Sequence, residues 1–88
     1  MNPRIQITKP LDEAKDVKPK FLTKGVVHPT DAEVKLTLTV NNATLSDIIK
    51  ALDGEWSYQI ESGKKGQATL DALIVGTKTS DTISFRII

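Results

Sequence analysis

Hydrophobic and polar residues alternate with a period of two through much of the chain, and this pattern constrains the fold most. Val34, Leu36, Leu38 and Val40 are apolar, whereas the residues between them are lysine or threonine. Successive side chains of a β-strand point to opposite faces, so the run predicts a strand with one face in a core and one in water. The 88-residue chain has the length of one domain, and we treat residues 1–88 as a single domain.

The same alternation recurs in three later segments, around residues 56–60, 68–74 and 83–87. A weaker run at residues 4–8 has apolar residues on one face, and glycine interrupts another at residues 20–27, where we expect a bulge or a close backbone approach. The inward positions of these strands form the predicted core, which comprises Ile5, Ile7, Val34, Leu36, Leu38, Val40, Trp56, Tyr58, Ile60, Leu70, Ala72, Ile83, Phe85 and Ile87.

The segment 44–52 fits two structures. Leu45, Ile48, Ile49 and Leu52 have the spacing of a helix face, and Thr44 or Ser46 could cap such a helix. A strand is the alternative, and we favour it because the segment lies between two predicted strands.

Turn-forming residues separate the predicted strands at intervals that suit a sandwich. They are Lys9-Pro10, Pro19, His28-Pro29, Asn41-Asn42, Asp53-Gly54, residues 63–66 and Gly76. Asp53-Gly54 is the strongest hairpin signal, because a type I′ turn needs positive φ at both central residues. The sequence therefore predicts an all-β protein, an immunoglobulin-like sandwich of about seven antiparallel strands in two sheets.

Several functional classes lack their usual signals. The chain has no cysteine and one histidine, which argues against disulfides and a zinc site, and its 12 basic and 11 acidic residues argue against nucleic acid as partner. No apolar run is long enough for membrane insertion. We find no catalytic motif, so we expect no enzyme activity and no cofactor.

Four segments together resemble bacterial immunoglobulin-like domains. They are residues 34–40 (VKLTLTV), 53–58 (DGEWSY), 66–72 (GQATLDA) and 80–85 (SDTISF). The resemblance covers roughly residues 4–88 and implies a scaffolding or accessory role, as in phage structural proteins, adhesins and spacers of enzymes.

The resemblance implies a virion protein of a bacteriophage, in capsid decoration or in the tail, that attaches to a protein surface. Residues 1–8 lack the apolar core of a secretory signal, which suits assembly in the host cytoplasm, and a start at Met followed by a strand favours a complete gene product. The alternative is an adhesion or carbohydrate-binding module from a larger protein of the bacterial surface or secretome. In it Trp56 and Tyr58 would make a weak glycan contact instead of filling the core.

The charged segment Lys9–Lys20 is the predicted docking loop. Asp12, Glu13, Lys15 and Asp16 are its candidate binding residues, and a calcium site on its acids is the less favoured alternative. Lysines and prolines are expected to blunt the sheet edges.

Overall fold

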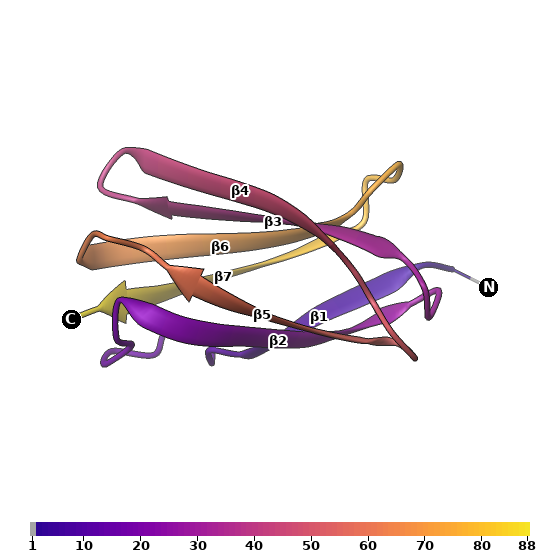
Figure 1. Ribbon diagram of the computed structural model, residues 1–88, viewed down its shortest axis with the longest axis horizontal. Coiled ribbons are helices and arrows are strands. Elements are labelled where there is room, and N and C mark those ends of the chain that lie inside the picture. Colours follow the sequence, from indigo (N-terminus) through magenta and orange to yellow (C-terminus); the bar gives the residue numbers. More distant parts are fainter. Residues whose placement is uncertain (1) are drawn as a thin grey trace.

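The computed structural model describes residues 2–88, in which the chain forms seven strands and two antiparallel sheets (Figure 1). The strands are β1 (Arg4–Lys9), β2 (Lys20–His28), β3 (Glu33–Val40), β4 (Ala43–Lys50), β5 (Glu55–Glu61), β6 (Gly66–Ile74) and β7 (Ser80–Ile87). One sheet has the order β1-β2-β5 and the other β4-β3-β6-β7. The predicted sandwich of about seven antiparallel strands is thus confirmed. Residues 2–88 contain no helix with the length and hydropathy needed to cross a membrane.

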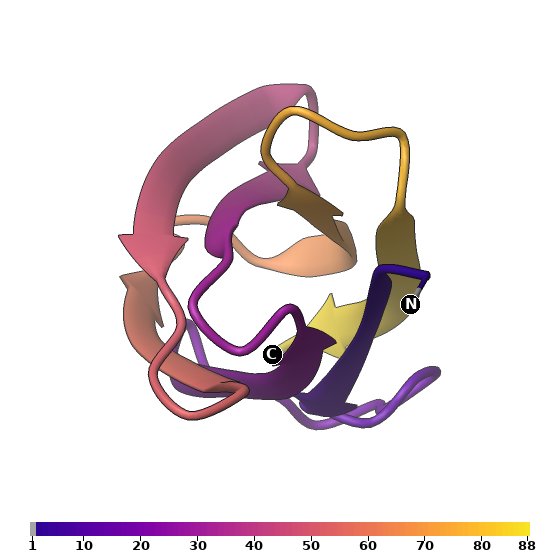
Figure 2. The same ribbon diagram turned by 90° about the vertical axis from the view of Figure 1, so that its right-hand side faces the viewer.

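The core lies between the two sheets, which Figure 2 shows facing each other. The buried core residues come from every strand except β4, and β4 contributes Ile49, which is half-buried and packs against the core. Ile5 and Tyr58 are half-buried, and the remaining residues of the predicted core are buried. The rings of Phe21 and Phe85 meet edge to face across the sheets, with their centroids 5.4 Å apart. Such aromatic pairs add to the stabilisation that burial alone provides.

Buried and exposed residues alternate in β2 as regularly as in β3, although hydrophobic and polar residue types do not alternate regularly in its sequence. Its inward positions include Phe21, Thr23, Gly25 and Val27, so only two of these four are large and apolar. The hydroxyl of Thr23 is buried and donates a hydrogen bond to the backbone carbonyl of Lys9. Gly25 marks a close approach, because the ring of Trp56 lies where a Cβ would be.

Two tight turns take the left-handed backbone of type I′ geometry. Asn41 and Asn42 have positive φ and close the hairpin of β3 and β4. Asp53 and Gly54 also have positive φ, as the sequence predicts. The turn closes an antiparallel bridge in which Leu52 and Glu55 exchange backbone hydrogen bonds. The hairpin predicted at Asp53-Gly54 extends no further than this bridge, because β4 and β5 belong to different sheets.

The ambiguous segment is a strand, β4, at the edge of the four-stranded sheet. Pairing with β3 places Leu45, Asp47 and Ile49 on the inner face, opposite buried residues of β3. Six of the eight residues of β4 are exposed, so both of its faces are largely accessible to solvent. An edge strand in this position needs no strict alternation, which explains why its apolar spacing also fits a helix.

Candidate functional site

The sandwich has two lateral sides, and they are built differently. β4 and β5 border one side, whereas β1 and β7 border the other (Figure 2). Each is an edge strand, so each has backbone groups that no strand of its own sheet pairs. How these groups are satisfied separates a closed side from an open one.

The side between β1 and β7 is closed. The backbone N–H of Ile7 in β1 donates to the carboxylate of Asp81 in β7, at 2.8 Å. The N–H of Ser84 in β7 donates to the carboxylate of Asp12, at 2.9 Å. Carboxylates that accept backbone N–H groups at a sheet edge occupy the positions that an incoming strand would need.

The loop of residues 10–19 further covers β7. Val17 forms a parallel bridge with Ile87, and its N–H donates to the carbonyl of Arg86. Arg86 in turn donates its N–H to the carbonyl of Ala14. Val17 is buried, so the loop contributes to the core as well as to the sheet edge.

The predicted docking residues therefore lie in a segment that is bound to its own domain. The Asp12 carboxylate accepts the backbone N–H of Ser84, and the N–H of Glu13 donates to the carbonyl of Ser84. The side chains of Glu13, Lys15 and Asp16 are exposed. No group of three acidic or histidine side chains in residues 2–88 has the arrangement of a metal site. On the β1–β7 side, aspartates accept the edge N–H groups, which the expectation of lysines and prolines did not include.

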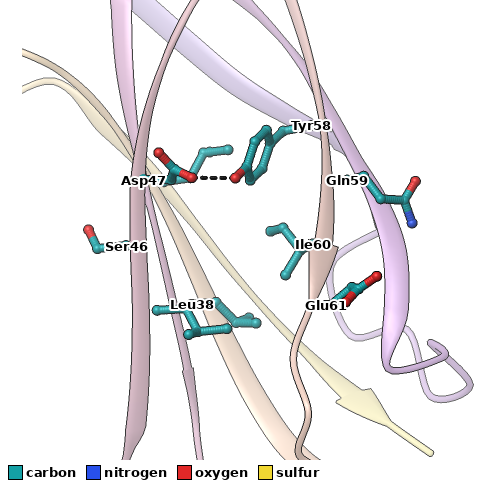
Figure 3. Close-up of a pocket in the computed structure, with 9 residues that line it drawn as sticks. Leu38, Ser46, Asp47, Tyr58, Gln59, Ile60 and Glu61 are labelled. Carbon is teal, nitrogen blue, oxygen red and sulfur yellow. Dashed lines mark hydrogen bonds between the residues drawn. The ribbon is translucent and has the colours of Figure 1, made fainter.

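The side between β4 and β5 is open. It contains a pocket of about 240 Å³. The residues that line it are Leu36, Leu38, Leu45, Ser46, Asp47, Tyr58, Gln59, Ile60 and Glu61 (Figure 3). Leu45 is 45% exposed and Ile48, on the outer face of the same strand, is 52% exposed. We call this pocket, with its two bordering strand edges, the β4–β5 groove.

The interior of the β4–β5 groove is mainly apolar. In Figure 3, Leu38 and Ile60 point into the gap, whereas Ser46, Gln59 and Glu61 point away from it. The last three residues consequently border the groove with their backbone. Asp47 and Tyr58 are the polar side chains that face each other across the gap.

Asp47 binds two groups at once. One carboxylate oxygen accepts the Tyr58 hydroxyl, and the other accepts the backbone N–H of the next residue, Ile48, at 3.0 Å. The hydrogen bond to Asp47, with smaller effects of burial and charge, raises the pKa of Tyr58 above 10.0. In sequence, Asp47 is recognisable only once the segment is assigned as a strand, because it then interrupts the inward series of Leu45 and Ile49.

Trp56 does not contribute to the groove. It is 4% exposed, and its indole N–H is buried without a hydrogen-bond partner. Tyr58 is half-buried, with its hydroxyl bound to Asp47. These two aromatic residues therefore do not present a flat exposed surface on which a sugar ring would stack.

Comparison with known proteins supports the fold. No protein-family model and no curated protein sequence matches the chain. An X-ray structure of the endo-β-1,4-mannanase from Thermotoga petrophila matches it with a TM-score of 0.66 and 15% identity. The match covers 100% of this chain and 20% of the mannanase chain, so the chain spans a fifth of that protein's length. This supports an all-β sandwich of two sheets.

The same match corrects one expectation. We expected no enzyme, because the sequence has no catalytic motif. The solved structure that the sandwich matches is that of an enzyme, so this expectation is wrong. A fold of this kind can form part of a catalytic protein, and a missing motif in one domain does not exclude that.

Proposed function

We propose that the chain is a bacterial immunoglobulin-like attachment domain that binds a protein partner through its β4–β5 groove. The observation that carries this proposal is the contrast between the two sides of the sandwich. Asp81, Asp12 and the loop of residues 10–19 cover the β1–β7 side. In residues 2–88, no loop covers β4, and Leu45 and Ile48 remain exposed beside the groove.

The chemistry of the groove suits a protein better than a sugar. Saccharide sites need several polar side chains that point inward to bind hydroxyl groups. The groove has inward-pointing polar groups only at Asp47 and Tyr58, which already bind each other. Its apolar interior and exposed strand edge instead match the way in which sheets take up extended peptides.

The biological setting follows from the family resemblance. In our proposal the domain belongs to a phage virion, in capsid decoration or in the tail, and its partner is a capsid, tail or cell-surface protein. The alternative setting is the bacterial cell surface or a secreted protein.

A second candidate function, carbohydrate binding, is supported by the mannanase match. Part of an enzyme named for β-1,4-mannan has the same fold as this chain. In that case Tyr58 and Asp47 would separate from each other to contact a saccharide.

Co-sedimentation of the labelled domain separates these functions. Its targets are purified phage particles, cell envelopes of the source and insoluble mannan. The groove variant is Leu45→Ser with Ile48→Ser. The matched control is Leu22→Ser with Val26→Ser, because both residues are 42% exposed on the outer face of β2.

We expect binding to a particle or envelope protein, a loss of about tenfold or more in the groove variant, and no loss in the control. An equal loss in both variants, or no binding to either protein target, would overturn the groove as attachment site. Binding to mannan alone would favour the second candidate.

A further inference from the structure

We propose that β4 binds an extended segment of another protein as an added strand, and that Asp47 selects a segment with a basic residue. The inference rests on the proposed attachment function and names its mode and the chemistry of the partner. It is drawn from the pairing of β4, the shape of the groove and the contacts of Asp47.

Strand β4 has backbone groups available in the geometry of strand addition. In an antiparallel ladder, alternate residues direct their N–H and C=O groups to the same neighbour. The two-residue turn makes Val40 and Ala43 a hydrogen-bonded pair, so the positions that face away from β3 are Thr44, Ser46, Ile48 and Lys50. The bond from the Ile48 N–H to Asp47 agrees with this register, because that N–H does not serve β3.

The β4–β5 groove would accept the side chains of such a strand. Alternate residues of an added strand point to the inner face of the sheet, where Leu45 and Tyr58 are partly exposed. The pocket beside them has a volume of about 240 Å³, which is enough for one or two apolar side chains. The added strand would bury Leu45 and extend the four-stranded sheet over the open side.

Asp47 controls access to this edge. Its carboxylate accepts a hydrogen bond from the Ile48 N–H. A backbone carbonyl of an added strand must replace the carboxylate as the acceptor of this N–H. In residues 2–88, no lysine or arginine forms an ion pair with Asp47. Once displaced, the carboxylate is left at the edge of an apolar groove, where a lysine or arginine of the partner compensates it.

A second copy of the chain does not meet this requirement. In a symmetric antiparallel pairing of two β4 strands, paired residues share a face, so Asp47 would lie opposite inner-face residues of the other copy. Those positions are Ala43, Leu45, Asp47, Ile49 and Ala51, none of which is basic. The charge pattern therefore favours a different chain as the partner.

Synthetic peptides test the proposal directly. The probe has eight residues, the length of β4, with valine alternating with threonine and one central valine replaced by lysine. A second peptide has glutamate in place of that lysine. Amide chemical shifts of the isotope-labelled domain report binding at each residue, and hydrogen exchange reports new backbone hydrogen bonds.

Three variants separate the contribution of the backbone from that of the charge. Ile48→Pro removes the N–H that faces away from β3 and keeps the hydrogen bonds of the β3 ladder, whereas Ile48→Ala removes the side chain and keeps that N–H. Asp47→Asn keeps an oxygen that can accept the Ile48 N–H but removes the negative charge. Its peptide affinities are compared with those of the wild type. Amide spectra of each variant establish that the fold is retained.

We expect the lysine peptide to protect the amides of β4 and to bind about tenfold more tightly than the glutamate peptide. Asp47→Asn should abolish this difference, and Ile48→Pro should abolish binding that Ile48→Ala retains. The proposal is wrong if millimolar peptide leaves the β4 amides unchanged, or if Ile48→Pro binds as well as Ile48→Ala. It is also wrong if the domain dimerises through β4. The co-sedimentation experiment distinguishes this failure from a failure of the proposed function. If the peptide tests fail but the Leu45→Ser, Ile48→Ser variant no longer binds the particle or envelope, the groove remains the attachment site and only strand addition is wrong.

Discussion

The indole ring of Trp56 lies against the backbone of Gly25, in the space that any side chain at that position would fill. A Cβ built on Gly25 would overlap two ring carbons of Trp56 and come within 2.5 Å of the carbonyl oxygen of Gln6. Gly25 pairs directly with Trp56 across β2 and β5. The glycine that interrupts β2 in the sequence therefore accommodates the largest side chain of the core.

Replacing Gly25 with alanine should destabilise the domain by about 3 kcal/mol or more, at the upper end of overpacking effects. Neither the Trp56 ring nor the Gln6 backbone has a flexible end that moves aside. Urea unfolding of the purified variant measures the change in free energy. Gly63→Ala is the control, because a Cβ there has no neighbour within 4 Å and the cost is limited to its left-handed backbone, about 1 kcal/mol. Equal losses in the two variants would contradict the packing argument.

The unpartnered indole N–H of Trp56 leads to a second prediction. Trp56→Ala should cost about 3–5 kcal/mol, as for other aromatic core truncations. Trp56→Phe should cost less than half as much, because it retains a ring and removes a buried donor whose burial costs about 1–3 kcal/mol. Urea unfolding compares the variants. Since Trp56 is the only tryptophan, a fluorescence maximum of the wild type near that of free tryptophan would contradict its burial.

The strands that are predicted most clearly are those whose inward residues are all apolar. In β3 and β7 every buried position is a large hydrophobic residue, so the period of two is visible. In β2, Thr23 and Gly25 fill inward positions for reasons that depend on distant partners, Lys9 and Trp56. No local pattern contains those contacts.

The groove could not be predicted for the same reason. It exists because β4 and β5, which follow each other in sequence, diverge into different sheets and remain side by side. The Asp53-Gly54 turn fixes the local backbone but does not determine which strands pair. Similarly, the charges of the loop at residues 10–19 suggested a free segment, whereas its backbone and Val17 hold it on β7.

Tyr58 should titrate above its ordinary value because of Asp47. Tyr58 is the only tyrosine, so the near-ultraviolet absorbance of its phenolate follows this group alone. We expect a midpoint above 10.0 in the native protein and a lower midpoint in Asp47→Ala, because the hydrogen bond that favours the neutral phenol is lost. A raised native pKa stabilises the fold below the unfolded pKa, and this contribution is lost as pH rises through the native pKa. An unchanged midpoint in Asp47→Ala would refute the coupling.

Asp81 should contribute to stability by capping the edge of β1. Asp81→Ala leaves the N–H of Ile7 without its acceptor, and we expect a loss of about 1–3 kcal/mol in urea unfolding. Asp81→Asn retains an oxygen acceptor and should lose less. If both variants unfold like the wild type, water replaces the carboxylate and the cap has no energetic role.

Asp47 should limit self-association of the domain through β4. Asp47→Ala exposes the Ile48 N–H beside the apolar side chains of Leu45 and Ile48, and an exposed apolar edge is a template for other strands. We expect this variant to aggregate faster than the wild type in light scattering at equal concentration. Asp47→Asn should remain close to the wild type, because its amide oxygen still accepts the Ile48 N–H. Glu33→Ala controls for the loss of one negative charge, since Glu33 is an exposed residue of β3. If Asp47→Asn and Glu33→Ala aggregate as fast as Asp47→Ala, charge loss and not the freed edge is responsible, and Asp47 does not guard β4.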